Sequence, residues 1–273
     1  MKDSRLIMGM PVTIEIVGTD KADANRKISS TLEDAFNYFT YVDETFSTFK
    51  KDSEIMNINR GEIKLENASP DMREIFKLAE QTKNETNGYF YIVNRDGVYD
   101  PSGIVKGWAI NNTAKLIKNA GFSNYYVDAG GDIEVGGHNS DGDKWSIGIR
   151  NPLNQDGNVK IVHLSDCGIA TSGTYVRGQH IYNPHDMREE FSDIVSLSVI
   201  GPNIYEADRF ATAAFAMGRK GIRFIENSNV TGKPRKFEGY MIDSKGIATM
   251  TSGFSDFVKK TANVSEETST GDS

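Results

Sequence analysis

The chain has 273 residues, of which 38% are hydrophobic and 25% are charged, and this composition predicts a soluble globular protein with a sizeable core. Its formal net charge of −7 argues against a protein built to bind nucleic acid or anionic lipid, because nothing offsets the repulsion from phosphates, although a local basic pocket for a small phosphate ligand is still possible. Cys167 is the only cysteine, which excludes an intramolecular disulfide and a cysteine-rich metal site.

The N-terminal residues give two expectations for localisation. Met1–Arg5 are charged and lead into a short mixed stretch, without the long apolar region or the cleavage site of a secretory leader. No apolar run approaches the roughly 20 residues that span a bilayer. The sequence as it stands predicts a cytoplasmic protein, or a bacterial envelope protein, periplasmic or lipid-anchored, if a leader has been removed.

The first part of the chain predicts one strand and three helices. Met8–Val17 alternates apolar and polar residues towards its end, as a half-buried strand does. Ala22–Phe46 repeats apolar residues at helical spacing. Ser69-Pro70-Asp71 is typical of a helix start, and that helix is expected to run to Gly88. A further helix is expected from near Gly107 to Ala120-Gly121.

The second part of the chain predicts mainly short strands. An antiparallel meander is expected from the segments Tyr125–Val127, Asp132–Val135, Trp145–Ile149 and Val159–Leu164, which Gly, Asn and Asp separate. A strand at Ile194–Val199, an alanine-rich helix at Glu206–Gly218 and a hairpin of Tyr240–Ile242 with Ile247–Met250 follow. The mixture predicts a single α+β domain over residues 1–262, with a disordered polar tail at 263–273.

Asp208 and Thr212 are the first candidate for chemistry. At i and i+4 of a helix their side chains share one face, so two oxygens could bind one hard cation. The alternative is that Asp208 is an acid favoured by the helix dipole in the first turn and that Thr212 is a packed neighbour. Spacing alone leaves both interpretations open.

Two glycine-containing segments are candidates for contacts with a ligand. Asp100–Gly107 precedes the third predicted helix and contains Lys106, a pattern that can hold phosphate or simply cap a helix. Asp128-Ala129-Gly130-Gly131-Asp132 follows a strand, and its glycines permit either close approach of a ligand or a tight turn.

Two further segments combine reactive or aromatic residues. Ala170–Ile181 is rich in hydroxyls and contains Arg177 and His180, but it lacks the nucleophile-elbow pattern of a hydrolase. His180 is a satisfied core residue or a general base. Phe46-Ser47-Thr48-Phe49 contributes either two core rings or a ring that stacks on a heterocycle. The other histidines show no metal-ligand spacing, so zinc is not expected.

The order of these segments resembles the successive motifs of the ApbE family, the FAD:protein FMN transferases. The resemblance is carried by Met8-Gly9, Phe46–Ile55, Asp100–Gly107, Asp128–Ile133, Ser172–Ile181 and Ala207–Gly218. It implies an ApbE-like, T-fold-related α+β fold, FAD as the donor substrate and Mg²⁺ at the pyrophosphate. It also implies a partner, an acceptor protein whose Thr or Ser hydroxyl receives FMN while AMP leaves.

The resemblance also implies roles for individual residues. Asp208 and Thr212 are expected to give side-chain oxygens to the metal, Gly103 its carbonyl, and His180 is expected to assist proton transfer. Contacts with FAD are expected from Asp100 and Lys106, and also from Gly130, Gly131, Ser172 and Arg177. The flavin or adenine pocket is expected to be lined by Met8, Phe49, Tyr89, Phe90, Tyr91 and Ile181.

Three departures from the usual pattern put the choice of acceptor in question. The loop after His180 reads Asn183-Pro184-His185-Asp186-Met187 instead of Asp-Pro, a basic residue, Thr and Gly. Arg209 stands where a small residue is common, near the expected metal, and Tyr89-Phe90-Tyr91 replaces Ala-Phe-Asp. FAD hydrolysis to FMN and AMP and a non-catalytic flavin-binding protein are therefore kept as alternatives, although an aromatic Phe49 favours transfer.

Overall fold

The computed structural model describes residues 1–18, 22–154, 157–174, 183–185, 193–228 and 237–258. Within these residues, one antiparallel sheet has the strand order β1-β2-β3-β4-β7-β8-β9-β10. Its strands are β1 (Lys2–Ile7), β2 (Met10–Ile16), β3 (Tyr125–Ala129), β4 (Asp132–Gly136), β7 (Cys167–Gly173), β8 (Ile194–Gly201), β9 (Glu238–Asp243) and β10 (Ala248–Met250). The predicted α+β class is confirmed.

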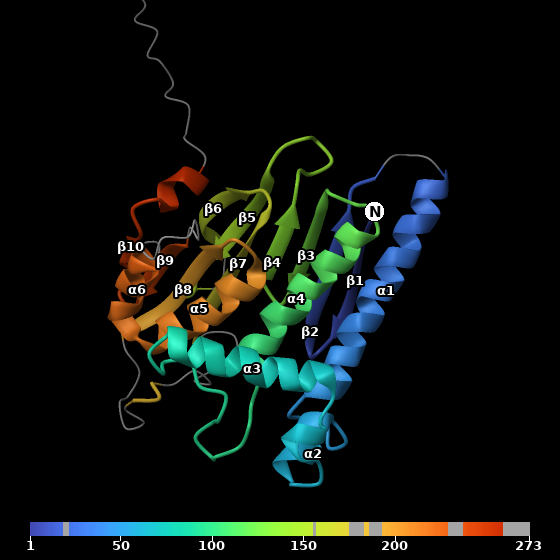
Figure 1. The fold of residues 1–273 in the computed structure, drawn as a ribbon. Helices are drawn as coiled ribbons and strands as arrows, with labels where there is room; N and C mark the ends of the chain where they lie inside the picture. The colour runs from blue at the N-terminus through green and yellow to red at the C-terminus, as the bar shows by residue number, and fades with distance from the viewer. Residues whose placement is uncertain (19–21, 155–156, 175–182, 186–192, 229–236, 259–273) are drawn as a thin grey trace, which may run out of the picture.

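Helices cover one face of this sheet. Figure 1 shows α1, α4 and α5 side by side over the strands, with α6 at the far edge and α3 across one end of α4 and α5. The helices are α1 (Ala22–Phe46), α2 (Glu54–Asn59), α3 (Pro70–Glu85), α4 (Ser102–Asn119), α5 (Ile204–Ala216) and α6 (Gly221–Asn227), with short 3₁₀ helices at Leu65–Asn67, Gly218–Lys220 and Phe254–Phe257. No described helix is long and apolar enough to cross a bilayer.

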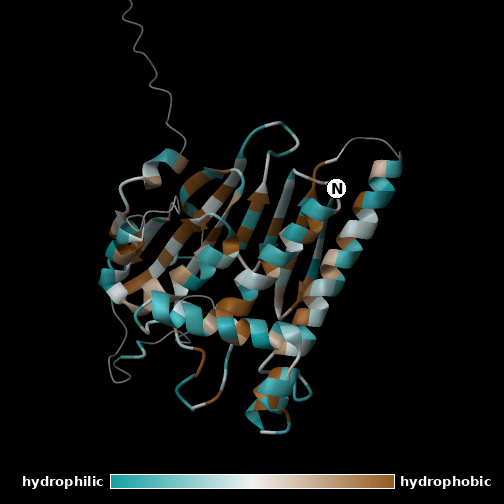
Figure 2. Ribbon diagram, viewed as in Figure 1, coloured by the Kyte–Doolittle hydropathy of each residue, from teal (hydrophilic) through white to brown (hydrophobic). Residues whose placement is uncertain are grey.

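The main core lies between the helices and the sheet. Alternate residues of β2, such as Val12, Ile14 and Ile16, are fully buried because they face the helices, as the period of a strand requires. Ile28 and Phe36 of α1 pack into the same cluster at helical spacing. In Figure 2 the strands carry most of the hydrophobic colour, whereas α3 shows polar residues on the side facing the viewer.

A hairpin covers the opposite face of the sheet and forms a second core. Its strands are β5 (Trp145–Arg150) and β6 (Asn158–Leu164), which pair only with each other among the described residues. Ile147 and Ile149 of β5 pack against Ile133 and Ile169 of the sheet. The predicted meander is therefore wrong between β4 and β5. β4 pairs with β7 instead, because the apolar side of the hairpin is buried by stacking on the sheet and not by extending it.

Several predicted elements are confirmed with changed ends. α1 has the predicted bounds, and the β9–β10 hairpin forms as expected. The helix expected from near Gly107 begins at Ser102, whose N–H donates to Asp100 Oδ1 at 3.0 Å. Gly103 and Gly107 lie in the first two turns of this helix, and the low helix propensity of glycine made its start hard to predict from the sequence. The strands β1 and β7 and the helices α2 and α6 were not predicted. None of them is longer than seven residues, and so short a segment contains few repeats of a strand or helix pattern.

The ends of three segments meet at one end of the sheet. The turn between β3 and β4, at Gly130-Gly131, reaches β2 through a hydrogen bond from Gly130 N–H to the Pro11 carbonyl at 3.0 Å. The turn between β1 and β2, at Met8-Gly9, lines the same cavity as Lys106 in the first turns of α4. The topology thereby brings together motifs that are far apart in the sequence.

Candidate active site

α4 and α5 cross closely where two glycines of α4 face α5. A Cβ on Gly107 would lie 2.7 Å from Cβ of Asp208, and a Cβ on Gly103 would lie 3.4 Å from Cγ2 of Thr212. Only glycine permits this approach at Gly107, because a methyl group there would overlap Asp208. The structure thus brings together Gly103, Asp208 and Thr212, the three residues predicted as metal ligands.

Asp208 is buried and hydrogen bonded within this crossing. It is 4% exposed, and its Oδ2 accepts the Gly107 N–H at 2.8 Å. In a regular α-helix the N–H of residue 107 donates to the carbonyl of residue 103. A carbonyl oxygen carries two lone pairs, so the Gly103 carbonyl can take part in the helix and still bind a cation.

The donor set at this crossing fits magnesium better than zinc. Among the described residues, no three His, Cys, Asp or Glu side chains lie close enough to hold a metal ion. The crossing offers one carboxylate, one hydroxyl and one backbone carbonyl, all hard oxygen donors. Mg²⁺ typically takes one or two carboxylates and completes its shell with water and substrate phosphates. These oxygen donors therefore fit a hard cation such as Mg²⁺, which would take its remaining ligands from elsewhere.

Lys106 forms an ion pair with Asp132, a residue that was not among the predicted site residues. Its Nζ lies 2.5 Å from Asp132 Oδ2, and Asp132 Oδ1 accepts the Thr171 N–H at 3.0 Å. The Asp132 side chain is 3% exposed and that of Lys106 is 20% exposed. Asp132 therefore holds the ammonium group in place beside the α4–α5 crossing. The position of Asp132 directly after Gly130-Gly131 is the feature of the sequence that could have assigned it to the site.

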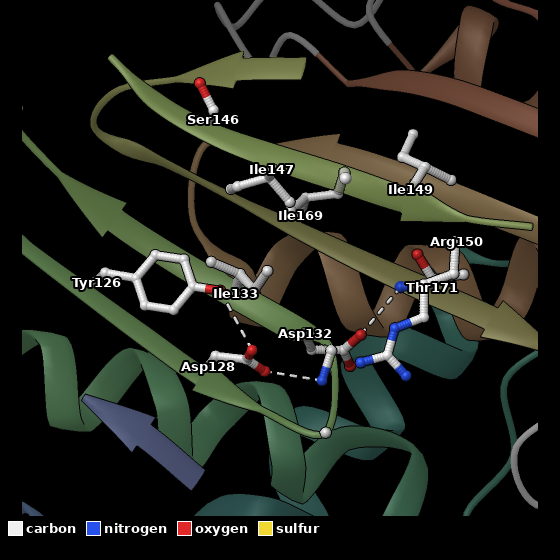
Figure 3. Close-up of a pocket in the computed structure, with 13 residues that line it drawn as sticks. Tyr126, Asp128, Asp132, Ile133, Ser146, Ile147, Ile149, Arg150, Ile169 and Thr171 are labelled. Atoms are coloured by element: carbon white, nitrogen blue, oxygen red, sulfur yellow. Dashed lines mark hydrogen bonds between the residues drawn. The ribbon is translucent and has the colours of Figure 1, made fainter. Parts of the chain in front are cut away.

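The Gly130-Gly131 turn is held by Asp128 (Figure 3). Both glycines have positive φ, +66° and +97°, and Asp128 Oδ1 accepts the Gly131 N–H at 2.8 Å. The Tyr126 hydroxyl donates to the other Asp128 oxygen at 3.2 Å. Burial raises the pKa of the Asp128 carboxyl, and these hydrogen bonds oppose that rise. The turn thus has a fixed shape.

A small polar pocket of about 180 Å³ lies between this turn and the β5–β6 hairpin. Figure 3 shows the Arg150 side chain and the backbone N–H of Thr171 directed towards Asp132, with Ile133, Ile147 and Ile169 forming the apolar side. Asp132 lines this pocket and also contacts Lys106. The two sides of the glycine turn are therefore connected through one carboxylate.

A larger cavity of about 580 Å³ opens beside Lys106. The predicted residues Met8, Phe49, Asp100 and Lys106 all line it. Phe49 is 95% exposed, so its ring is available to stack on a bound heterocycle. Its other walls include Met10, Phe46 and Val105. Four predicted FAD contacts are thus gathered around one cavity of ligand size.

Other predicted contacts lie elsewhere. Phe90 is 3% exposed and packs behind the crossing, where its ring would be 3.2 Å from a Cβ on Gly103. Tyr89 packs on His185 instead of lining the larger cavity. Tyr91 is exposed beside Lys83, whose Nζ lies 4.7 Å from the ring centroid. Ser172 is buried in β7.

His180, the predicted general base, is not among the residues that the structure describes. Arg177 and Ile181 also lie outside the described residues, as does the predicted tail at 263–273.

The expected placement of Arg209 near the metal needs correction. Its side chain is 1% exposed, and the guanidinium pairs with Glu85 and Glu206, each at 2.5 Å. These carboxylates neutralise the cation on the side of α5 that faces α3. Residues next to each other on a helix point in directions about 100° apart, so Arg209 does not follow Asp208 into the crossing.

A comparison with known proteins gives the family of the chain. The model of the ApbE family matches residues 8–99 and 93–232. The chain belongs to the ApbE family. The matched residues include the α4–α5 crossing, Lys106 and the turn at Gly130-Gly131, so every described feature of the candidate site falls within the ApbE match.

Curated relatives within the ApbE family share sequence over part of their length. The FAD:protein FMN transferase of Vibrio cholerae is 35% identical over 139 residues, which cover 48% of this chain and 42% of the relative. The Escherichia coli protein of the same name is 31% identical over 128 residues, covering 44% and 36%. The chain thus matches about two fifths of the length of these relatives.

Solved structures of the ApbE family share the fold over nearly the whole chain. The flavin transferase ApbE from Vibrio cholerae has a TM-score of 0.78 at 22% identity, covering 94% of this chain and 99% of the other. The ApbE protein from Thermotoga maritima has a TM-score of 0.79 at 18% identity, covering 95% and 99%. At these identities the likeness establishes the fold.

Proposed function

We propose that this chain is a Mg²⁺-dependent FAD:protein FMN transferase. The observation that carries the proposal is the close crossing of α4 and α5, with Gly103, Asp208 and Thr212 together and Lys106 one turn further along α4. The adjoining cavity of about 580 Å³, lined by Met8 and Phe49, has the size and the apolar walls that a flavin nucleotide needs. The name of the matching relatives, FAD:protein FMN transferase, supports the same reaction.

The reaction transfers the FMN phosphoryl group from one oxygen to another. A Thr or Ser hydroxyl oxygen of the acceptor protein forms a bond to the FMN phosphorus of FAD. The bond from that phosphorus to the oxygen bridging to AMP breaks, and AMP leaves with that oxygen. The hydroxyl proton passes to His180 in this proposal. Mg²⁺, when bound, supplies charge neutralisation at the pyrophosphate as the leaving group develops.

The residues of the chain orient the substrate and stabilise charge. Asp208, Thr212 and the Gly103 carbonyl would hold Mg²⁺ through oxygen atoms. Lys106 adds a second positive charge at the pyrophosphate, and Asp132 keeps its ammonium group in position. Phe49, at the mouth of the cavity, would stack on the flavin or the adenine and exclude water from the phosphorus.

The test is incubation of the chain with FAD and Mg²⁺, with and without a Thr-containing acceptor protein. Covalent FMN on the acceptor, measured by mass and by flavin fluorescence, together with AMP release, is the expected result. AMP release without an acceptor, and no labelled acceptor, would favour FAD hydrolysis. FAD binding without any AMP would leave a flavin-binding protein.

A variant of the carboxylate tests the metal site. Asp208→Asn keeps an oxygen that can accept the Gly107 N–H but removes the negative charge, so we expect the fold to be retained and turnover to fall by about 100-fold or more, the cost of removing one strong electrostatic contact in a transition state. Asp141→Asn, in an exposed turn, is the matched control. Full activity of Asp208→Asn at low Mg²⁺ would overturn the metal assignment.

A further inference from the structure

The cavity beside Lys106 has two walls that come from distant parts of the sequence. One wall is residues 46–50, which include the exposed ring of Phe49, and we call it the Phe49 wall. The other comes from the segment 100–106 at the start of α4, and we call it the Asp100 wall. A ligand that contacts both walls binds best when they are already held at the right separation. The contacts that join the two segments therefore matter for binding.

The Phe49 wall is fastened to the N-terminus of α2. The hydroxyl of Ser53 donates to the Ser47 carbonyl at 2.7 Å, and the Ser47 hydroxyl oxygen accepts the Phe49 N–H at 3.3 Å. Ser53 is buried and is also the N-cap of α2, where its hydroxyl oxygen accepts the Met56 N–H at 3.3 Å. The Phe49 wall and α2 thus form one hydrogen-bonded unit.

Asn59, the last residue of α2, binds both backbone groups of Tyr99. Its Nδ2 donates to the Tyr99 carbonyl and its Oδ1 accepts the Tyr99 N–H, each at 2.9 Å. Since a side-chain NH₂ only donates and a carbonyl oxygen only accepts, these two bonds fix the orientation of the amide. Tyr99 directly precedes Asp100, whose Oδ1 accepts the Ser102 N–H at the start of α4. The contact of Asn59 therefore reaches the residue next to the Asp100 wall.

We propose that Asn59 is a positioning residue for FAD, because it fixes the Phe49 wall relative to the Asp100 wall. The inference rests on the proposed function, which makes FAD the ligand of this cavity. Asn59 is not one of the described residues that line the cavity, so it acts through Tyr99. The Tyr99 ring also packs on Phe76 of α3, with centroids 4.9 Å apart and an interplanar angle of 71°. Tyr99 is thus held on two sides, and Asn59 ties α2 to it.

The candidate metal site is held by other contacts. The Gly107 N–H donates to Asp208, and Lys106 pairs with Asp132. Neither contact includes α2 or Tyr99. Loss of the Asn59 amide should therefore weaken the binding of FAD and leave the chemical step unchanged, which raises KM at constant kcat. A residue that served stability alone would lower the amount of active protein, and so the apparent kcat, at constant KM.

The experiment compares Asn59→Ala with the wild type. The affinity for FAD is measured by flavin fluorescence, and KM and kcat for FAD are measured from AMP release with Mg²⁺ and a Thr-containing acceptor protein. We expect Kd and KM to rise by about five- to tenfold, the effect of two partly exposed hydrogen bonds, and kcat to stay within about twofold of the wild type.

Asn94→Ala is the matched control. Asn94 Oδ1 accepts the N–H groups of Asp96 at 3.0 Å and Val98 at 3.1 Å, so the variant also loses two hydrogen bonds to backbone in the loop before Asp100. These bonds do not reach α2, and we expect the wild-type KM for FAD. A rise in KM as large as that of Asn59→Ala would show that any damage to this loop has the same effect, and would overturn the proposal.

Two conservative variants test the amide itself. Asn59→Gln keeps a donor and an acceptor on a longer side chain and should recover part of the loss. Asn59→Asp keeps the shape and the acceptor, but it sets a carboxylate oxygen beside the Tyr99 carbonyl, and two acceptors cannot bond. Its KM should be at least as high as that of Asn59→Ala, and a wild-type KM for Asn59→Asp would contradict the proposal. If Asn59→Ala does not fold, Asn59→Asp supplies the comparison.

The remaining outcomes separate this inference from the proposed function. If the wild type binds FAD but releases no AMP, the proposed transfer fails alone, and Kd still decides the role of Asn59. If the wild type binds no FAD, both fail. A fall in kcat at constant KM for Asn59→Ala, or no change in either, would overturn the positioning role. The Tyr99 amide should exchange its hydrogen faster in Asn59→Ala, and unchanged protection would refute the contact.

Discussion

At the scale of single residues, the ion pair of Lys106 with Asp132 joins two groups with very different access to water. The Asp132 side chain is 3% exposed, with Oδ1 accepting the Thr171 N–H and Oδ2 in an ion pair with Lys106, whereas the Lys106 side chain is 20% exposed. A long lysine stem can turn its ammonium group towards solvent, but a buried aspartate cannot leave its place. Removal of Lys106 and removal of Asp132 should therefore lower the free energy of unfolding by different amounts.

This asymmetry gives a stability prediction. Lys106→Met leaves a buried carboxylate without its cation, so the free energy of unfolding should fall by roughly 3–5 kcal/mol. Asp132→Asn should cost less, because the amide oxygen still accepts the Thr171 N–H and Lys106 can reach water. Urea denaturation of the two variants measures the difference. Equal losses, or a larger loss for Asp132→Asn, would contradict the prediction.

At the scale of secondary structure, the approach of α4 to α5 depends on glycines that weaken α4 itself. Glycine in a helix costs about 1 kcal/mol relative to alanine. Gly107 nevertheless fits here, because Asp208 occupies the space that a side chain at position 107 would need, and its carboxylate accepts the Gly107 N–H. Local propensity and tertiary packing are in conflict here, as is common at a functional site.

Alanine substitutions separate the two effects. Gly107→Ala should lower the free energy of unfolding by about 1–3 kcal/mol despite the better helix propensity, since the new methyl group would lie 2.7 Å from Cβ of Asp208. The same variant should lose Mg²⁺-dependent AMP release. Gly103→Ala is the matched control, with contacts no closer than 3.2 Å, and should cost less. Urea denaturation that ranks Gly103→Ala as the more damaging change would refute this account.

At the scale of the whole molecule, Glu134 of β4 joins the sheet to both helices of the candidate site. Its Oε2 accepts from Asn111 Nδ2 of α4 at 3.0 Å and from the Ile204 N–H at the start of α5 at 3.2 Å. Burial raises the pKa of this carboxyl, and the two hydrogen bonds together with Lys118 and Lys115 partly oppose the rise. One carboxylate thus fixes the sheet and the two helices at a common point.

The raised pKa of Glu134 predicts how stability depends on pH. The native state binds the Glu134 proton more tightly than the unfolded state does. This difference stabilises the fold fully at pH values below the ordinary glutamate pKa of about 4.3. The stabilisation is lost as pH rises through the pKa that Glu134 has in the native state. Glu134→Gln has no such titration and keeps an oxygen acceptor. We expect the wild type to gain stability relative to Glu134→Gln as pH falls from 7 towards about 4.3. Urea denaturation across this range measures it, and a difference that does not change with pH would rule it out.

The sequence alone determined the features that depend on neighbouring residues. Caps and helical periodicity defined α1 and α3, and the i, i+4 spacing predicted that Asp208 and Thr212 share a face. The order of short motifs predicted the family, which the family match confirms. These signals act within a few residues, because a cap, a helical face or a motif is complete within one or two turns of chain.

Only the tertiary structure decided the features that join distant segments. The pairing of β4 with β7, the ion pair of Lys106 with Asp132, the orientation of Arg209 away from Asp208 and the docking of His185 on Tyr89 could not be inferred from local patterns. Each of these contacts depends on burial and on charge interactions between residues that are far apart in the sequence. Asp132 and Arg209 carry the same formal charges in any fold, and the packing of α4, α5 and the sheet decides which partner each one meets.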